Sequence, residues 1–353
     1  MQMYKIAVDL GYGYTKGINQ DGEKIIFPSV VGAAHHRELK DLFGQSMSNK
    51  LDNIHVQIKE GDLEGEYFVG KLAFDSLSKS YAFDSNKIWH ENTIVNLATV
   101  STLLGGGKEE LLLVTGLPLQ FYKNQQREFS SFLKMFDAQV ILKGEDEFSQ
   151  TIRFARAAVF PQAAGAIYQA VAEHPQLKHP TGSTIAVVDV GFRTTDFIVV
   201  RVGTPLETVE TLSGTIETGM SHLNRVFAEQ YFAETGKQAD FAQVTRYLAN
   251  GCTFYFNGQN YDLSQKMESA KAELAKTIKD GLIANWRDAY QDFRAVIFVG
   301  GGSRELMNLF RKQFSAAMTV SNPQFANTQG FLFYANLLER KMMSGQGQTG
   351  WNK

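Results

Sequence analysis

The first segment of the chain that could do chemistry is a glycine-containing turn after an apolar run. It reads Asp9-Leu10-Gly11-Tyr12-Gly13-Tyr14-Thr15-Lys16. Gly11 and Gly13 would let backbone N–H groups turn inward onto phosphate oxygens, as in an anion-binding nest. Thr15 could add a hydroxyl donor, Lys16 a positive charge, and Asp9 a carboxylate for the waters around a magnesium ion. Taken alone, the pattern is more typical of a tight hairpin turn with no ligand.

A second turn repeats this pattern later in the chain. It reads Asp189-Val190-Gly191-Phe192-Arg193-Thr194-Thr195-Asp196 and follows the apolar segment Thr184–Val188. Its glycine and threonines offer backbone and hydroxyl donors, and Asp189 is a second carboxylate at a strand end. Two such turns in one chain favour phosphate binding over coincidence.

A third glycine-rich segment, Gly300-Gly301-Gly302-Ser303, stands between an apolar run and a helical pattern. Three consecutive glycines are entropically costly in a plain connection. The segment therefore favours close approach of the backbone to a base or a phosphate.

Short apolar runs rich in β-branched residues precede these turns and alternate with helical patterns, which indicates an α/β architecture. The expected strands are Tyr4–Val8, Leu111–Thr115, Thr184–Val188 and Ala295–Val299. The expected helices are Asn92–Leu104, Tyr122–Phe136, Gln162–Glu173, Gly219–Thr235 and a long one over Leu263–Tyr290. In the long segment, apolar residues recur every three or four positions as one stripe: Met267, Ala270, Leu274, Ile278, Leu282, Trp286 and Tyr290.

The length of 353 residues predicts two lobes. We expect a first lobe over 1–165 with a small insert at about 33–72, and a second over 166–335 with a helical insert at about 226–284. Residues 336–353 would form the end of a helix and a loose polar tail.

Composition excludes several classes of protein. The formal net charge of −2 gives no global field toward nucleic acid or anionic lipid. No apolar run approaches the roughly 20 residues needed to cross a bilayer, and no leader-like segment opens the chain. The single Cys252 fits a reducing cytoplasm and is expected to be half-buried. His35 and His36 have no partners at metal-ligand spacing. We therefore expect a cytoplasmic protein that neither enters membranes nor binds nucleic acid directly.

Together, the three glycine motifs resemble the actin, heat-shock chaperone and sugar-kinase ATPase superfamily. The closest resemblance is to the plasmid-segregation actins of the ParM/StbA type and their archaeal relatives. Three further segments support it: Phe68-Val69-Gly70, Val114-Thr115-Gly116-Leu117-Pro118, and Asn322–Asn327 followed by Gly330-Phe331. The resemblance implies a two-lobed actin-like fold, each lobe a mixed sheet flanked by helices, with the nucleotide in a central cleft.

The same resemblance assigns roles to residues. Asp9 and Asp189 would hold Mg²⁺ through water. The nucleotide, ATP with GTP as the alternative, would contact both turns, the glycine-rich segment and a lysine of the long helix. The residues so implied are Gly11, Gly13, Tyr14, Thr15, Lys16, Gly191, Phe192, Arg193, Thr194, Lys271, Gly301, Gly302 and Ser303.

Gln162 is the position at which the resemblance places hydrolysis. Many plasmid-segregation relatives have Glu there, whereas actin has Gln. Glutamine cannot act as a general base, but it can orient an attacking water. The alternative is that Gln162 only caps the following helix. Glu217 is equally open to a structural or a binding role, and Gly219 is expected at a close backbone approach.

Three functions fit these residues. The first is a polymerising cytoskeletal ATPase that moves DNA through a DNA-binding adaptor. The second is a small-molecule kinase, for which no substrate-side base motif is evident. The third is a nucleotide-binding adaptor that hydrolyses little. We expect the first, with the filament itself as the main partner.

Overall fold

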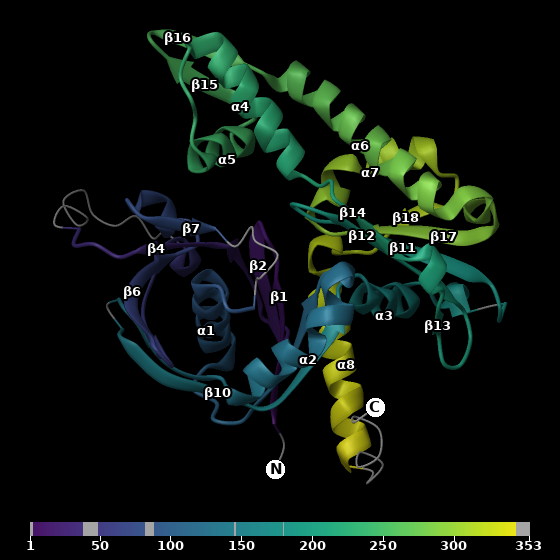
Figure 1. Ribbon diagram of the computed structural model, residues 1–353, viewed down its shortest axis with the longest axis horizontal. Coiled ribbons are helices and arrows are strands. Elements are labelled where there is room, and N and C mark those ends of the chain that lie inside the picture. Colours follow the sequence, from purple (N-terminus) through teal and green to yellow (C-terminus); the bar gives the residue numbers. More distant parts are fainter. Residues whose placement is uncertain (1–2, 38–48, 82–87, 145, 179, 344–353) are drawn as a thin grey trace. The chain divides into compact units, whose positions relative to one another are not determined.

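The computed structural model describes residues 3–37, 49–81, 88–144, 146–178 and 180–343 (Figure 1). The chain divides into two compact units. The first unit comprises Met1–Gln169 and Phe325–Lys353, and the second comprises Ala170–Gln324. Among the described residues, no helix is both long and apolar enough to cross a membrane.

The first unit is built on a mixed sheet that has ten strands within the described residues, in the order β3-β2-β1-β8-β10-β9-β5-β6-β4-β7. Its strands are β1 (Tyr4–Leu10), β2 (Tyr14–Asn19), β3 (Lys24–Pro28), β4 (Val30–Ala33), β5 (Ile54–Glu60), β6 (Leu63–Val69), β7 (Lys79–Tyr81), β8 (Leu111–Leu117), β9 (Asp137–Leu142) and β10 (Phe148–Pro161). Its helices are α1 (Glu91–Gly105), α2 (Leu119–Met135), α8 (Ala326–Met343) and most of α3 (Ala164–Glu173).

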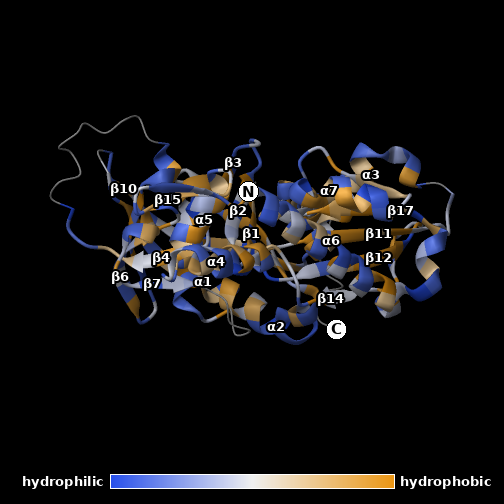
Figure 2. Ribbon diagram, turned by 90° about the horizontal axis from the view of Figure 1, so that it is seen from above, coloured by the Kyte–Doolittle hydropathy of each residue, from blue (hydrophilic) through white to orange (hydrophobic). Residues whose placement is uncertain are grey.

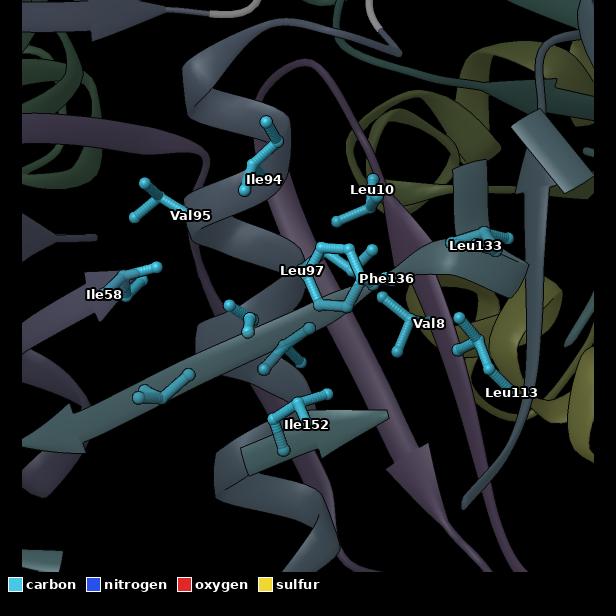
Figure 3. Close-up of a cluster of buried hydrophobic side chains, with 14 of the residues drawn as sticks. Val8, Leu10, Ile58, Ile94, Val95, Leu97, Leu113, Leu133, Phe136 and Ile152 are labelled. Atoms are coloured by element: carbon cyan, nitrogen blue, oxygen red, sulfur yellow. The ribbon is translucent and has the colours of Figure 1, made fainter. Parts of the chain in front are cut away.

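Apolar side chains on both faces of the central strands form two hydrophobic cores, one on each side of the sheet. In β1, Ile6 and Val8 join a cluster with residues of α1, α2, β5 and β9. Figure 3 shows Val8, Leu113 and Leu97 in this cluster. Ala7 points to the opposite face and packs with Phe331 of α8. Successive side chains of a strand point to opposite faces, so one strand serves both cores.

The polar region expected as an insert continues the main sheet. β5 pairs with β9, β6 pairs with β5, and β4 joins β6 to β7. Residues 38–48 of this region lie outside the described residues. His35 lies edge-on to Phe68, with 5.1 Å between the ring centroids.

The second unit holds a sheet in the order β13-β12-β11-β17-β18, with β14 paired to β12, and a separate two-stranded ribbon. Its strands are β11 (Thr184–Val190), β12 (Thr195–Arg201), β13 (Glu207–Thr208), β14 (Gly214–Ile216), β15 (Thr253–Phe256), β16 (Gln259–Asp262), β17 (Phe293–Val299) and β18 (Ala317–Thr319). Its helices are α4 (Ser221–Thr235), α5 (Phe241–Ala249), α6 (Ser264–Trp286) and α7 (Gly301–Gln313). The hydropathy colouring of Figure 2 marks β11 and β17 as hydrophobic, as expected for central strands.

The apolar stripe predicted for the long helix is confirmed from Met267 to Trp286, where each residue of the stripe is buried. The helix stops earlier than predicted, because Arg287 has a positive φ of 51°. Tyr290 lies in the 3₁₀ segment that follows, Arg287–Asp292. Cys252 is half-buried, as expected.

The unit boundaries differ from those expected, since residues 325–335 belong to the first unit. The reason is packing: Phe331 and Ala335 of α8 are fully buried against β1 and β8. Lys5 of β1 also forms a buried ion pair with Glu339 of the same helix. The tail over 344–353 lies outside the described residues.

Close contact between α3 and α8 makes a first prediction. A Cβ atom at Gly330 would lie 1.8 Å from the carbonyl oxygen of Gly165. Gly330→Ala should therefore force the helices apart and lower the free energy of unfolding by about 3 kcal/mol. Urea unfolding followed by circular dichroism would measure this. Gly144→Ala is the control, because no atom lies within 4 Å of the place that its Cβ would take. Equal unfolding midpoints for the two variants would contradict the prediction.

Candidate nucleotide-binding site

The first glycine turn connects β1 to β2 in a fixed antiparallel register. Asp9 lies opposite Lys16, and Leu10 lies opposite Thr15. The Gly11 N–H closes the turn by donating to the Tyr14 carbonyl oxygen at 3.1 Å. A Cβ at position 11 would lie only 2.6 Å from that oxygen, so the turn requires glycine.

Asp9 brings three of the predicted residues together. Its carboxylate is 3% exposed and accepts two hydrogen bonds. Lys16 Nζ donates to Oδ2 at 3.1 Å, and Gln162 Nε2 donates to Oδ1 at 2.7 Å. Two donors from different elements fix the orientation of this carboxylate, as a magnesium site needs.

Gln162 itself is held by its backbone. Its N–H donates to the Leu117 carbonyl oxygen at 2.8 Å, while its side chain reaches Asp9. The next residue, Ala163, has a positive φ of 68°, and its N–H donates to Asn327 Oδ1 at 3.1 Å. Helix α3 begins at Ala164. The Gln162 amide is therefore directed to the strand-end carboxylate, which favours the site interpretation over the helix cap.

The second glycine turn repeats the geometry of the first. In the β11–β12 hairpin, Asp189 lies opposite Asp196 and Val190 opposite Thr195. The Gly191 N–H donates to the Thr194 carbonyl oxygen at 2.9 Å, the same bond that closes the first turn. The duplication seen in the sequence is thus a duplication of hairpin geometry.

A buried carboxylate fixes the second turn from within. Asp196 is 3% exposed and accepts from the hydroxyls of Thr194 and Thr215. Thr195 donates its hydroxyl to the Thr218 carbonyl oxygen at 2.8 Å. These bonds tie the turn to β14 and to the segment that leads into α4.

The start of α4 supports the same turn. The N–H groups of Met220 and Ser221 donate to the carbonyl oxygens of Gly191 and Phe192 at 3.0 and 2.7 Å. A Cβ at Gly219 would lie 2.7 Å from both oxygens. The expectation that Gly219 marks a close backbone approach is therefore confirmed.

Gly300 lies directly against Asp189. Its backbone, with φ 85° and ψ 170°, is in a region that is essentially restricted to glycine. A Cβ there would lie 2.1 Å from Asp189 Oδ1. The third glycine motif thus shapes the surroundings of the second strand-end carboxylate.

The rest of this motif packs inward at the start of α7. A Cβ at Gly302 would lie 2.5 Å from Cγ1 of Val190. The hydroxyl of Ser303 donates to the Gly300 carbonyl oxygen at 2.8 Å. Packing accounts for both residue types, and their contact with a nucleotide stays a prediction, as does that of Gly301.

Lys271 of α6 forms ion pairs with two glutamates. Its Nζ lies 2.8 Å from Glu268 Oε1 and 3.1 Å from Glu305 Oε2 of α7. Burial works against its charge, but the hydrogen bonds to these carboxylates outweigh burial and raise the pKa of Lys271. Lys271 therefore joins α6 to α7, and its predicted contact with the adenine or ribose would have to coexist with these pairs.

Three bulky side chains of the two turns, Tyr14, Phe192 and Arg193, are less buried than the strand-end carboxylates. Tyr14 is 39% exposed. Phe192 packs edge-on against Phe241, with ring centroids 5.6 Å apart. Arg193 Nε lies 4.0 Å from Glu217 Oε2, and both side chains are exposed. This contact leaves both interpretations of Glu217 open.

The sequence analysis assigned no supporting role to three residues. Ser29 hydrogen-bonds the first turn, Asp196 the second, and Asn327 the backbone beside Gln162. Asp196 could have been suspected from the repeated Asp-x-Gly pattern. Asn327 stands in a segment that supported the resemblance, but nothing local in the sequence indicates its bond to Ala163 or that of Ser29 to Gly11.

Each unit supplies one buried strand-end carboxylate of the kind that holds magnesium through water. Asp9 and Asp189 are both buried at strand ends, with 3% and 8% of their surfaces exposed. Across the described ranges, no three His, Cys, Asp or Glu side chains gather as a metal cage. Magnesium commonly keeps several waters and takes one or two carboxylates together with substrate phosphates.

Two α/β units, each with an aspartate and a glycine turn at the end of a central strand, define an actin-like class of fold. The chain matches the family described as "Actin like proteins N terminal domain" over residues 7–165. Residues 187–312 match "Archaeal actin homologue MreB-like, C-terminal".

Solved structures and curated relatives agree with these matches. A non-polymerisable quadruple mutant of pCBH ParM is 31% identical, with 95% of this chain and all of that chain covered and a TM-score of 0.85. The subunit of a 15-stranded ParM filament from Clostridium botulinum is 30% identical over 96% of this chain and all of that chain, with a TM-score of 0.86. The archaeal actin homolog of Thermoplasma acidophilum is 23% identical over 96% of this chain and its own full length. An archaeal actin homolog in complex with ADP shares the fold, with 21% identity over 95% of this chain and all of that chain and a TM-score of 0.77. The chain belongs to the actin-like ATPase family, and the ParM-type assignment is confirmed.

The contact between Gly300 and Asp189 makes a second prediction. Gly300→Ala should introduce both backbone strain and a clash, and it should lower the free energy of unfolding by about 3 kcal/mol. Gly301→Ala is the matched control at the same helix start, because its nearest neighbour, Gln324 Nε2, lies 3.9 Å from the added Cβ. Urea unfolding of both variants would test this, and a Gly300→Ala midpoint equal to that of the control would refute it.

Proposed function

We propose that this protein is a nucleotide-dependent ATPase that polymerises into cytoskeletal filaments and segregates plasmid or other DNA through an adaptor. The observation that carries the proposal is the repeated hairpin turn, in which an aspartate, a glycine N–H and a closing carbonyl take the same positions twice. The similarity to a ParM filament subunit supports assembly.

The nucleotide is proposed to be ATP, with GTP as the alternative. Both turns would present backbone N–H groups to its phosphates, and Lys16 would add a positive charge beside Asp9. Magnesium, when bound, would neutralise charge on the phosphate oxygens. Asp9 and Asp189 would hold its waters, for which burial and orientation suit them.

Hydrolysis is proposed to depend on Gln162. Its amide is fixed by the bond to Asp9 and by the backbone bond to Leu117, so its position is determined before substrate arrives. A fixed amide can accept from and donate to an attacking water without removing its proton. Gln162 would thus orient water, as the glutamines of other phosphoryl-transfer sites do.

DNA is proposed to be engaged in the cytoplasm through a separate DNA-binding adaptor. The formal net charge of −2 does not supply the phosphate-neutralising field that direct duplex binding needs. The adaptor would carry the DNA contacts, and the filament would supply force or position.

Assembly is the third prediction. ATP with Mg²⁺ should increase right-angle light scattering at micromolar protein, and electron microscopy of the pellet should show filaments. ADP and nucleotide-free samples are the controls and should scatter less. A protein that stays monomeric at tens of micromolar with ATP bound would exclude the filament and leave the kinase or the non-polymerising adaptor.

The fourth prediction separates binding from chemistry. Gln162→Ala should bind ATP and assemble, but hydrolyse about 10²-fold more slowly, because one group that positions the water is lost. Its filaments should therefore last longer. Single-turnover phosphate release would measure the rate. Gln169→Ala on α3 is the matched control, since both glutamines are 8% exposed. Turnover within about twofold of wild type in Gln162→Ala would reduce Gln162 to a structural residue.

A further inference from the structure

Ser29 lies between β3 and β4 and makes three hydrogen bonds to the first glycine turn. Its hydroxyl donates to the Gly11 carbonyl oxygen at 2.7 Å and lies 2.9 Å from Thr15 Oγ1. Its N–H donates to the Gly13 carbonyl oxygen at 3.0 Å. Ser29 is 3% exposed and Thr15 is 1% exposed, so water does not compete for these bonds.

The single hydroxyl hydrogen of serine fixes the direction of the bond between the two hydroxyls. That hydrogen of Ser29 is donated to Gly11. Thr15 must therefore be the donor to Ser29. Its only hydroxyl hydrogen points into the protein, so Thr15 does not donate to a phosphate in this arrangement.

The same bonds orient the peptide groups of the turn. In a trans peptide the C=O and the following N–H point in opposite directions. Because the carbonyls of Gly11 and Gly13 point at Ser29, the N–H groups of Tyr12 and Tyr14 point away from it. The two N–H groups therefore lie on the side of the turn opposite Ser29. The two carbonyl groups lie on the same side as Ser29.

Ser29 is in turn fixed by the first turn of α1. Asn92 Nδ2 donates to the carbonyl oxygens of Ser29 at 3.1 Å and Ser80 at 3.0 Å. Asn96 Nδ2 donates to Asn92 Oδ1 at 2.9 Å. Asn92 and Asn96 are each 1% exposed. The turn, Ser29 and α1 therefore form one buried hydrogen-bonded chain.

We propose that Ser29 is a positioning residue that sets the first turn for nucleotide phosphate, and that Thr15 supports it instead of contacting the phosphate. The inference rests on the proposed function, because it concerns the same nucleotide. It assigns the affinity for polyphosphate to backbone N–H groups whose direction Ser29 determines, and it revises the hydroxyl-donor role predicted for Thr15.

The test compares dissociation constants for ADP and ATP, each with Mg²⁺, by isothermal titration calorimetry. Ser29→Ala should weaken binding about tenfold or more, because the Gly11 carbonyl loses the hydroxyl that holds it toward residue 29, while the backbone bond to the Gly13 carbonyl remains. Thr15→Val, which keeps the shape and removes the hydroxyl, should stay within about threefold of wild type. Thr15→Ser should bind like wild type.

Ser76→Ala is the control for a general loss of stability. Ser76 is also 3% exposed, and its hydroxyl also donates to a backbone carbonyl, that of Ala33 at 2.8 Å. The Ser76→Ala variant should lose a similar amount of free energy of unfolding in urea and should bind nucleotide with the affinity of wild type. An equal loss of affinity in Ser76→Ala and Ser29→Ala would overturn the positioning role.

The remaining outcomes separate this inference from the proposed function. Wild-type protein that binds neither nucleotide would overturn both. Wild-type binding with unchanged affinity in Ser29→Ala would overturn the inference alone. If Ser29→Ala does not fold, Thr15→Val decides: a tenfold loss of affinity would make Thr15 a direct phosphate ligand and refute the proposal.

Discussion

The antiparallel register of two hairpins is the constraint on which the candidate site depends. Pairing places Asp9 opposite Lys16 in one hairpin and Asp189 opposite Asp196 in the other. Each register leaves four residues for the turn, and in each turn the first N–H bonds the fourth carbonyl. Glycine is required at the first position because a side chain would strike that carbonyl. Within each unit, the apolar strands thus bring a carboxylate and backbone donors together.

Internal hydrogen bonds engage the polar side chains of the candidate site, and they occupy the only hydroxyl hydrogen of each of two threonines. The hydroxyl of Thr15 is donated to Ser29 and that of Thr194 to Asp196. Lys16 and Gln162 both donate to Asp9. Such bonds give up free donors but fix the geometry before a ligand arrives, and preorganised dipoles need no rearrangement during reaction. On the proposed function, these bonds leave the backbone N–H groups of the two turns as the main donors to phosphate.

The C-terminal helix makes the first unit depend on both ends of the chain. Phe331 and Ala335 fill the face of the sheet opposite α1, and Lys5 pairs with Glu339. Because Gly330 has no side chain, the backbone of α8 packs directly against the backbone of Gly165 in α3. Asn327 at the start of the same helix holds the N–H next to Gln162. Helix α8 therefore both completes a core and positions a residue of the candidate site.

The sequence by itself determined the α/β class, the central strands, the amphipathic α6 and the two Asp-x-Gly turns, because these depend on local periodicity and on glycine's conformational freedom. Only the tertiary structure decided that residues 325–335 return to the first unit and that β5 and β6, in the expected insert, continue its sheet, since burial against distant strands has no local signature. The hydrogen-bond partners of Thr15 and Ser303 likewise come only from the tertiary structure. A hydroxyl looks like a ligand in sequence, and only its neighbours show where its single hydrogen goes.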